Sequence, residues 1–404
     1  MKLLVVLPWM PYPLNDGGKQ GSFNMLEQLQ YKLDIVLIYP VESVNQLKYQ
    51  MELQERLLNI KIYPFEYYHH KGNVFSQFFL FRLHRLLTKK ILKQPYLATP
   101  VYEETYINFV NDVILKEKID VVQNEYVELL YLVYTLPQHV KRIFVQHEIQ
   151  YINKKRNIQT RDFVSSELQY LFNKIKQDEI SAMNQYDFIV TMTEADKEIL
   201  VNDGVRTPIY SSPSFIPLHK GASFKACTEN NLTFIGGSVH YPNLNGICWF
   251  LKEVWPLILE ENGDMKLNII GRWTKQAKKN IQRKYSNVNF LGFVPRLCDA
   301  ITGTIMVVPI LIGSGIRMKI FESVNCYTPF VTTKIGVEGL DFKSGEECIV
   351  TDDPREFAKS ILELTKNVDL QQMLAENAHK KLLDKYSSET SSQRRLCIYE
   401  ELYK

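Results

Sequence analysis

A sequence of 404 residues is long for one domain and fits two, at about 100–200 residues each. Its 45% hydrophobic and 23% charged residues are typical of globular proteins and exclude a mainly disordered or fibrous chain. The 48 Lys and Arg residues nearly balance 45 Asp and Glu residues, so the formal charge of +3 does not indicate a nucleic-acid partner.

The N-terminal segment MKLLVVLP does not have the form of a signal peptide, because Pro8 ends the apolar run and no small-residue cleavage site follows. It fits a first buried strand. No window reaches the roughly 18 consecutive apolar residues that a membrane-spanning helix needs. All six cysteines lie in the second half without a C-x-x-C pair, which favours reduced thiols in a cytoplasmic protein.

Short runs of β-branched and aliphatic residues alternate with stretches of helical period along the chain. In the first half these runs span residues 3–7, 34–39, 119–123, 142–146 and 187–192. In the second half they span residues 231–237, 266–271, 288–294, 305–310, 329–333 and 348–352. Continuous apolar strands separated by helices are typical of parallel sheets covered on both faces. The predicted fold class is α/β, with two Rossmann-like parallel-sheet domains.

A change in composition separates the two series of strands. Residues 207–230 show neither the apolar runs of a strand nor the periodicity of a helix, and they are rich in Pro, Ser and Thr, which is typical of a linker. We predict an N-terminal domain over 1–206, a C-terminal domain over 231–384 and a final helix over 385–404. Ligands of open parallel sheets bind beyond the carboxyl ends of the strands, so residues directly after strands are the candidates for function.

Candidate binding residues follow several strands of the first half. Gly17 and Gly18 can admit a phosphate or sugar close to the backbone, although glycine pairs also form ordinary turns. Glu125, His147 and Glu148 follow two later strands and are expected to project toward the same edge. A structural role is the alternative for His147.

In the second half, Gly271 and Arg272 directly follow the apolar strand KLNII. An arginine at a strand's carboxyl end can neutralise a diphosphate. Lys278 follows within a run of lysines, for which a solvated helix face is the alternative.

The most informative stretch is VVPILIGSGIRMKIFESV, residues 307–324. Its glycines let backbone N–H groups approach an anion, the following helix begins with positive potential, and two side chains add full positive charges. This pattern predicts a phosphate cradle with a carboxylate one turn deeper, for which a surface ion pair is the alternative. The residues concerned are Gly313, Ser314, Gly315, Arg317, Lys319 and Glu322.

Several common motifs are missing from the sequence. There is no G-x-G-x-x-G after the first strand, no G-x-x-x-x-G-K-[ST], no G-x-S-x-G and no D-x-D. Their absence argues against dinucleotide redox chemistry, P-loop hydrolysis, serine hydrolysis and D-x-D metal chemistry. No metal or other cofactor is predicted.

Four blocks in residues 234–340 resemble, in family order, the donor-nucleotide domain of glycosyltransferase family 4: FIGGSVHYPNLNGICWFLKEVWPLI, LNIIGRW, GFV and VVPILIGSGIRMKIFESVNCYTPFVTTKIGVEGL. In the first half, QHEIQYINKKR and YDFIVTMTEAD are more loosely similar. The resemblance implies a GT-B fold, in which two Rossmann-like domains face each other across a cleft and a C-terminal helix returns to the first. It also implies retaining transfer of a sugar from a nucleoside diphosphate sugar.

Matched positions imply roles for individual residues. Glu322 would bind the ribose hydroxyls, and Arg272 and Lys278 would neutralise the departing diphosphate. Gly17 and Gly18 would line the diphosphate and sugar, and His147 would contact the donor sugar. The other donor-binding positions would be Gly237, Gly271, Phe293, Val294, Ser314, Gly315, Ile316, Arg317 and Lys319. Glu125 and Glu148 would serve the acceptor.

Two departures from the family pattern matter. Ser314 stands where the family commonly has a second glutamate, as in a subgroup with G-S-G-x-R-x-K, in which Arg317 and Lys319 share the phosphate role. The usual Pro-Asn-Gly loop after the first domain is replaced by SSPSFIP. A nucleotide-sugar epimerase and a non-catalytic two-lobed sugar-binding protein remain alternatives.

The acceptor expected from the resemblance is a glycan or lipid-linked glycan of bacterial surface polysaccharide synthesis. Residues 71–93 contain basic and aromatic residues and no acidic one. Such a segment predicts either peripheral binding to the anionic inner face of the plasma membrane or packing of its apolar side on the first domain.

Overall fold

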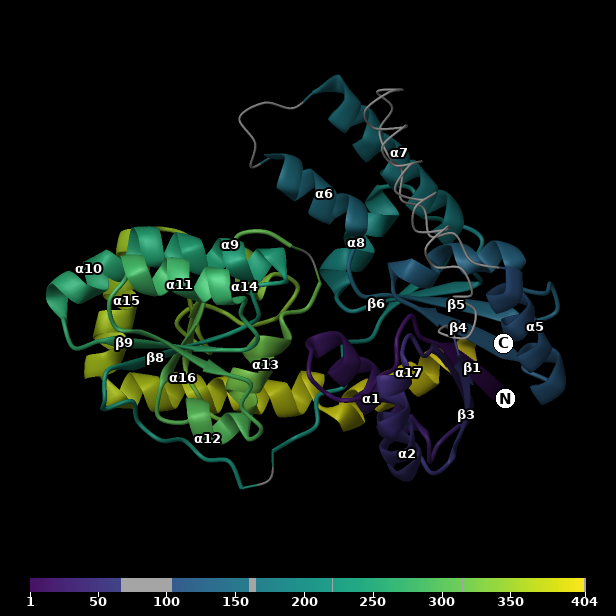
Figure 1. The fold of residues 1–404 in the computed structure, drawn as a ribbon, viewed down its shortest axis with the longest axis horizontal. Helices are drawn as coiled ribbons and strands as arrows, with labels where there is room; N and C mark the ends of the chain where they lie inside the picture. Colours follow the sequence, from purple (N-terminus) through teal and green to yellow (C-terminus); the bar gives the residue numbers. More distant parts are fainter. Residues whose placement is uncertain (67–103, 160–164, 220, 314, 403–404) are drawn as a thin grey trace. The chain divides into compact units, whose positions relative to one another are not determined.

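The computed structural model describes residues 1–66, 104–159, 165–219, 221–313 and 315–402. Within them the chain forms two compact units, each built on a parallel sheet (Figure 1). The first comprises Met1–Phe215 and Ser391–Lys404, and the second Ile216–Thr390. The predicted α/β class with two Rossmann-like sheets is confirmed.

Residues 71–93, predicted either to bind a membrane or to pack on the first domain, lie outside the described residues, and both alternatives stay predictions. Among the helices that are described, none combines the length and hydrophobicity required to span a bilayer.

The first unit contains a 7-stranded sheet in the order β3-β2-β1-β4-β5-β6-β7. Strand β1 pairs in parallel with β2 on one side and with β4 on the other, so the order changes direction between β1 and β4. Ligands of open α/β sheets bind beyond the strand ends at such a point. The strands are β1 (Lys2–Val6), β2 (Asp34–Pro40), β3 (Ile60–Phe65), β4 (Val121–Glu125), β5 (Lys141–Gln146), β6 (Phe188–Thr191) and β7 (Ile209–Ser211).

The first helix starts at the glycine pair found in the sequence. The N-cap residue Asp16 accepts a hydrogen bond from the backbone N–H of Lys19 at 2.9 Å, which fixes the start of α1 at Gly17. The other described helical segments of this unit are η1 (Val44–Gln46), α2 (Leu47–Arg56), α5 (Glu104–Glu117), η3 (Val127–Thr135), α6 (Gln150–Gln159), α7 (Ser166–Met183) and α8 (Glu194–Asn202). Apolar residues of β1, β2 and β4 form one core with α5, and those of β5 and β6 form another with α7.

The second unit contains a 6-stranded sheet in the order β10-β9-β8-β11-β12-β13. Its order changes direction between β8 and β11, because β8 pairs with β9 on one side and β11 on the other. The strands are β8 (Asn231–Ile235), β9 (Lys266–Ile270), β10 (Val288–Gly292), β11 (Ile305–Val308), β12 (Phe330–Thr332) and β13 (Ile349–Val350).

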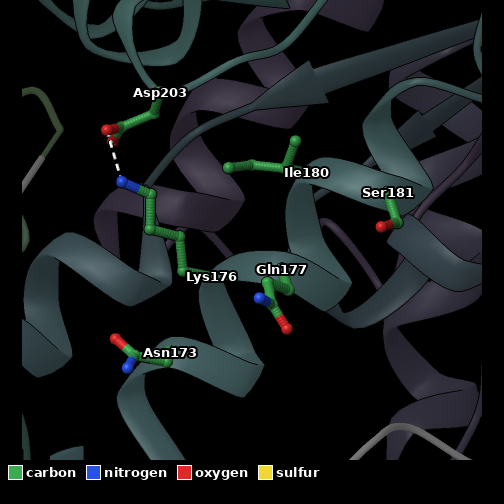
Figure 2. Close-up of a pocket in the computed structure, with 6 residues that line it drawn as sticks. All are labelled: Asn173, Lys176, Gln177, Ile180, Ser181 and Asp203. Atoms are coloured by element: carbon green, nitrogen blue, oxygen red, sulfur yellow. Dashed lines mark hydrogen bonds and ion pairs between the residues drawn. The ribbon is translucent and has the colours of Figure 1, made fainter.

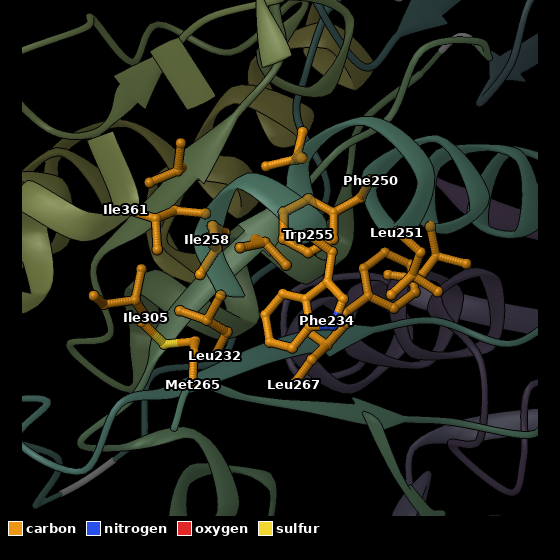
Figure 3. Packing of buried hydrophobic residues seen from close by; sticks show 14 of the residues in the cluster. Leu232, Phe234, Phe250, Leu251, Trp255, Ile258, Met265, Leu267, Ile305 and Ile361 are labelled. Carbon is orange, nitrogen blue, oxygen red and sulfur yellow. The ribbon is translucent and has the colours of Figure 1, made fainter. Parts of the chain in front are cut away.

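Helices cover both faces of this sheet (Figure 1). They are α9 (Tyr241–Trp249), η4 (Phe250–Val254), α10 (Trp255–Glu261), α11 (Lys275–Lys284), α12 (Leu297–Ile301), α13 (Met318–Asn325), α14 (Lys334–Val337), α15 (Pro354–Lys366), α16 (Val368–Lys381) and η5 (Leu382–Tyr386). The chain then continues into the last helix, α17 (Ser388–Glu401). Figure 3 shows the core around Trp255, where Phe234 and Phe250 pack from strand and helix. The Trp255 indole N–H donates to the Ser286 carbonyl at 3.1 Å, so its polar atom is satisfied.

The chain passes between the units at different residues from those predicted. Residues 209–211 lie in the predicted linker 207–230 but form β7, which pairs with β6. The second unit begins at Ile216, and the final helix α17 belongs to the first unit from Ser391 onward. The physical reason is that β7 is a short edge strand, and an edge tolerates neighbouring prolines and polar residues.

The expectation that all six cysteines are reduced also differs from the structure. Cys298 and Cys326 form a disulfide with a Cα–Cα distance of 5.2 Å, whereas Cys227, Cys248, Cys348 and Cys397 are free. The sequence separation of 28 residues gave no sign of this pairing, because helix α12 and the end of α13 bring the two cysteines together.

Candidate active site

In the second unit, the loops that follow β8 and β9 approach each other closely. A Cβ at Gly237 would lie 2.9 Å from the carbonyl oxygen of Arg272, and a Cβ at Gly271 would lie 2.7 Å from that of Gly236. The φ of Gly271 is +130°, which side chains rarely adopt. Both glycines are therefore needed for this backbone arrangement at the strand ends.

Lys319 reaches from α13 to the same loops. Its ammonium donates a 2.6 Å hydrogen bond to Oδ1 of Asn243 and lies 4.4 Å from the centre of the Phe234 ring. Asn243 in turn donates to the Gly237 carbonyl at 3.2 Å. Burial, reinforced by the Arg317 charge, lowers the pKa of Lys319 to about 7. The lysine is a cation whose charge a bound anion would stabilise.

Arg317 caps the start of α13 and is 9% exposed. Its guanidinium donates to the Gly315 carbonyl at 2.5 Å and to the Ile335 carbonyl at 3.4 Å. Gly315 has a φ of +78°, in the region that favours glycine. Arg317 therefore braces the glycine turn as well as bringing positive charge to it.

The remaining members of the predicted cradle lie on or beside α13. Glu322 is half-buried, and its charge partly offsets the lowering of the Lys319 pKa. Ile316 packs at the edge of the core formed by β11, α13 and α16. Ser314 lies outside the described residues.

The predicted residues after β9 and β10 differ in exposure. Arg272 is exposed at the end of β9, and Lys278 on α11 lies with its ammonium 5.7 Å from the Phe290 ring centre. Phe293 is 59% exposed, whereas Val294 packs on the small core around Ile270. An exposed aromatic ring directly after a strand is suited to cover a flat ligand group.

In the first unit, Glu125 and His147 form a close pair at the ends of β4 and β5. The His147 Nε2 lies 2.5 Å from the Glu125 Oε2, and Glu125 is 1% exposed. Gln123 donates to the other carboxylate oxygen at 2.6 Å. The carboxylate thus accepts from both neighbours and holds a proton on Nε2 of His147. This burial suits Glu125 to orient the histidine rather than to meet an acceptor directly.

Tyr126 completes this arrangement, and sequence reasoning missed it. Its ring stacks on the His147 ring at 3.7 Å between centroids and 8° between planes. Its φ of 69° and ψ of 154° fall in a region that is essentially restricted to glycine, at a cost of order 1–3 kcal/mol. The strained residue directly follows Glu125 and is held by its contacts.

The Tyr126 hydroxyl connects the histidine to the glycine pair. It donates to the Gly18 carbonyl at 2.8 Å and lies 3.0 Å from the Ser22 hydroxyl. Trp9 packs beside it, with ring centroids 4.5 Å apart, and a Cβ at Gly18 would lie 3.3 Å from the Trp9 ring. Gly17, Gly18, Glu125 and His147 are therefore brought together through Tyr126.

A second missed residue comes from the far end of the chain. Tyr399, on α17, donates a 2.6 Å hydrogen bond to Oε1 of Gln123 and is 1% exposed. Gln123 then donates to Glu125, so a buried chain of hydrogen bonds runs from α17 to His147. Only the fold could reveal this connection across 276 residues of sequence.

Glu148 lies beside this group but has its own contacts. Its carboxylate accepts from Asn153 at 3.1 Å, and its carbonyl accepts from Gln146 at 2.5 Å. The next helix, α6, begins at Gln150, and the backbone of Gln150 and Tyr151 favours the charged form of the buried Glu179. Burial nonetheless raises the pKa of Glu179 to about 8.

A hollow in the first unit, lined largely from α7, does not coincide with these residues. It is lined by Asn173, Lys176, Gln177, Ile180, Ser181 and Asp203 (Figure 2). Lys176 and Asp203 form an ion pair beside it. It contains no residue predicted from the sequence, and we assign the candidate site from the strand ends instead.

Comparison with known proteins bears on the second unit first. Residues 229–367 match the family model described as "Glycosyl transferases group 1". This stretch includes Gly237, Arg272, Lys319 and Glu322. The matched stretch lies within the second unit.

Similarity to whole proteins extends over both units. An uncharacterised 44.6 kDa protein in the cps region of Klebsiella pneumoniae is 26% identical over 408 residues, covering 96% of this chain and 97% of that protein. The crystal structure of TarM superposes with a TM-score of 0.72 at 14% identity, covering 98% of each chain. Anabaena HepE in complex with UDP gives a TM-score of 0.69 at 10% identity, covering 99% of this chain and 100% of HepE. The fold is GT-B, and together with the group 1 domain it supports a glycosyltransferase.

Proposed function

We propose that the protein is a retaining glycosyltransferase of family 4, in the subgroup with the G-S-G-x-R-x-K motif. It transfers a sugar from a nucleoside diphosphate sugar to a glycan or lipid-linked glycan in bacterial surface polysaccharide synthesis. The cps-region relative supports the biological setting. Structures of TarM with UDP and α-GlcNAc-glycerol, and of HepE with UDP and glucose, support a nucleotide sugar and a glycan as substrates.

The observation that carries the proposal is the cationic end of α13 within the group 1 domain. Lys319 lies against the glycine loops with a pKa of about 7, and Arg317 braces the glycine turn beside it. A diphosphate bound here would place its negative charge beside these two cations. Glu322, one turn along α13, then serves the ribose hydroxyls, and the exposed Phe293 lies beside the base.

The chemical step needs charge stabilisation on the departing diphosphate. As the bond between the anomeric carbon and the phosphate oxygen breaks, negative charge develops on that oxygen, and preorganised cations lower the barrier. Arg272, Lys278, Arg317 and Lys319 supply them without a metal ion. The acceptor hydroxyl forms its new bond on the same face, and its proton passes to the leaving phosphate.

The first unit contributes a fixed histidine. Because Glu125 holds the proton on Nε2 of His147, the Nδ1 atom is left as the available nitrogen. Gly17 and Gly18 offer backbone N–H groups at the start of α1, where the helix dipole favours negative charge. We assign His147 to the donor sugar and the glycine pair to the diphosphate.

A donor screen tests the proposal. UDP-, GDP- and ADP-sugars are added to the full chain in EDTA, and thermal stabilisation and release of nucleoside diphosphate are measured. One class should stabilise the protein and be hydrolysed slowly, and transfer should follow when glycan acceptors are supplied. Binding of none would contradict the proposal, and conversion of the donor to an epimer without acceptor would assign an epimerase. Activity that needs added Mg²⁺ or Mn²⁺ would contradict metal independence.

Peripheral membrane binding is a further part of the proposal and rests on the sequence of residues 71–93. Each nearby cation adds roughly 1 kcal/mol of attraction to an anionic surface. The protein should therefore sediment with anionic vesicles at low salt and be released at high salt. A variant in which Arg85, Lys89 and Lys90 are all changed to Glu should not bind. Wild-type protein that stays free of the vesicles would favour a soluble acceptor.

A further inference from the structure

Two cysteines and a histidine gather in the second unit, and the cysteines share a small core with Val294. The Sγ atoms of Cys298 and Cys326 and an imidazole nitrogen of His219 all lie within 4.8 Å of one another. Among the described residues, this is the one set of three His, Cys, Asp or Glu side chains close enough to hold a metal ion. Two sulfurs and an imidazole form a donor set that zinc prefers.

The buried side-chain amide of Asn325 holds the backbone around His219 next to Cys326. The backbone N–H of His219 donates to the Asn325 Oδ1 at 3.0 Å, and the Asn325 Nδ2 donates to the Pro217 carbonyl at 2.6 Å. Asn325 is 3% exposed and directly precedes Cys326. The histidine is thus held beside the cysteine by hydrogen bonds, although the two lie far apart in the sequence.

A disulfide joins the two cysteines alone, whereas a metal site also needs a further ligand such as the histidine. We propose that the reduced form of this protein binds one zinc ion through Cys298, Cys326 and His219. Cys326 and Cys298 differ in burial, and His219 is exposed, so the fourth position of a tetrahedral ion faces solvent and takes water.

The positions of Cys298 and Cys326 are compatible both with a disulfide and with two thiolates bound to one zinc ion. With Zn–S bonds of about 2.3 Å and a tetrahedral angle, the two sulfurs stand roughly 3.8 Å apart. The Cα atoms of the pair are 5.2 Å apart, and rotation of the side chains can separate the sulfurs without moving the helices.

Opening the disulfide requires two electrons from a thiol reductant. Two reductant thiols become one disulfide, and Cys298 and Cys326 become thiols. Zinc then displaces the two thiol protons and binds both thiolates and the neutral imidazole. Oxidation and zinc binding exclude each other, so the redox state of the pair sets the metal content of the protein.

The zinc ion would join three segments of the second unit. His219 lies just after the chain enters this unit at Ile216, Cys298 lies on α12, and Cys326 caps α13. The opposite end of α13 carries Arg317 and Lys319. Because the ion binds the folded unit more tightly than the unfolded chain, it raises the melting temperature of the reduced protein.

The test compares the reduced and oxidised full chain. Protein reduced with a phosphine is titrated with zinc against a chromophoric chelator, and free thiols are counted. Reduced wild type should bind one zinc per chain and melt at a higher temperature with zinc, whereas the oxidised protein should bind none. His219→Ala and Cys298→Ser should each weaken zinc binding at least about 100-fold. His139→Ala and Cys248→Ser, at exposed positions elsewhere, should bind as wild type does.

The proposal is overturned if reduced wild type binds no zinc, or if the oxidised form binds equally well. It is also overturned if folded His219→Ala binds zinc as tightly as wild type, because the cysteines alone would then account for binding. Circular dichroism verifies that each variant is folded. If one variant does not fold, the reduced and oxidised wild type still decide the outcome.

Discussion

The candidate residues of the two units differ in how their charges and hydrogen bonds are satisfied. In the second unit, two cations of α13 lie beside closely packed glycine loops, and burial together with the Arg317 charge lowers the pKa of Lys319 to about 7. In the first unit, His147 is already paired with a carboxylate and stacked on Tyr126. A bound anion would stabilise the cations of the second unit, whereas the histidine of the first unit already has its partner within the protein. We therefore expect second-unit residues to control both donor binding and leaving-group departure, and first-unit residues to affect turnover with little change in donor affinity.

The largest effects are expected from the arginines of the second unit. Arg272→Ala and Arg317→Ala should each lower turnover by about 10²–10³-fold, the usual effect of removing one group that stabilises transition-state charge. Arg317→Ala should also lower the melting temperature, because its guanidinium hydrogen-bonds to two backbone carbonyls, whereas the exposed Arg272 should be neutral for stability. Arg283→Ala, on the exposed side of α11, is the control. Unchanged turnover in both variants would refute the diphosphate assignment.

The second-largest effect is expected on donor affinity rather than on turnover. Glu322→Ala removes the carboxylate assigned to the ribose hydroxyls, which should cost about 2–3 kcal/mol, or roughly 30- to 150-fold in donor affinity. Calorimetric titration with the donor measures it. The exposed Glu363→Ala on α15 should bind as wild type does. Wild-type donor affinity in Glu322→Ala would remove Glu322 from the site.

The corresponding test in the first unit is Glu125→Gln. The amide no longer offers a charged acceptor to Nε2 of His147, and turnover should fall about 10- to 100-fold, since a hydrogen bond to a charged group contributes about 1.5–3 kcal/mol. Donor affinity should change less than about threefold. The pH profile of turnover should shift as well, which a purely structural role would not cause. Glu128→Gln, nearby and exposed, is the control, and an unshifted profile with full turnover would contradict a positioning role.

The smallest expected effect is a coupling between donor binding and protons. The Lys319 pKa is lowered to about 7 by burial and then by Arg317. A diphosphate favours the charged lysine and raises its pKa, so binding should take up a proton above pH 7 and weaken as the pH rises further. Calorimetry in two buffers with different ionisation enthalpies measures the uptake.

Two variants assign this proton. Uptake should vanish in Lys319→Met and persist in His240→Gln, whose imidazole pKa is lowered by burial and by the same cations. The opposite pattern would assign the proton to His240. Without donor, an unfolded lysine holds its proton up to about pH 10.4 while folded Lys319 loses it near pH 7, so stability should rise with pH between these values.

Much of the fold followed from the sequence because its inner strands are continuous apolar runs. The two strands that we missed, β3 and β7, lie at opposite edges of the first sheet. Pro64 in β3 and the prolines around β7 made these segments look unlike strands, yet an edge strand needs hydrogen bonds on one side only. Local composition therefore predicts the centre of a sheet better than its edges.

The candidate site likewise contains residues that local sequence predicts and residues that only the folded chain reveals. The glycines and cations of the second unit were predictable because their role depends on residue type and on their position after a strand. The roles of Tyr126, Gln123 and Tyr399 depend on contacts made only in the folded chain, and Tyr126 shows its role through a strained backbone that no composition reveals. Asn243 was likewise missed, because an asparagine in a helix gives no sign of a lysine partner 76 residues away.

The contact between the Trp9 and Tyr126 rings provides an intrinsic fluorescence signal near His147. The chain has 4 tryptophans, and the other three, Trp249, Trp255 and Trp273, belong to the second unit. Trp9 contacts the ring that stacks on His147, so we expect its emission to change when a sugar binds beside this histidine. Subtracting the spectrum of Trp9→Phe from that of wild type isolates this signal. Events at the histidine can thus be timed by stopped-flow fluorescence without attaching a dye.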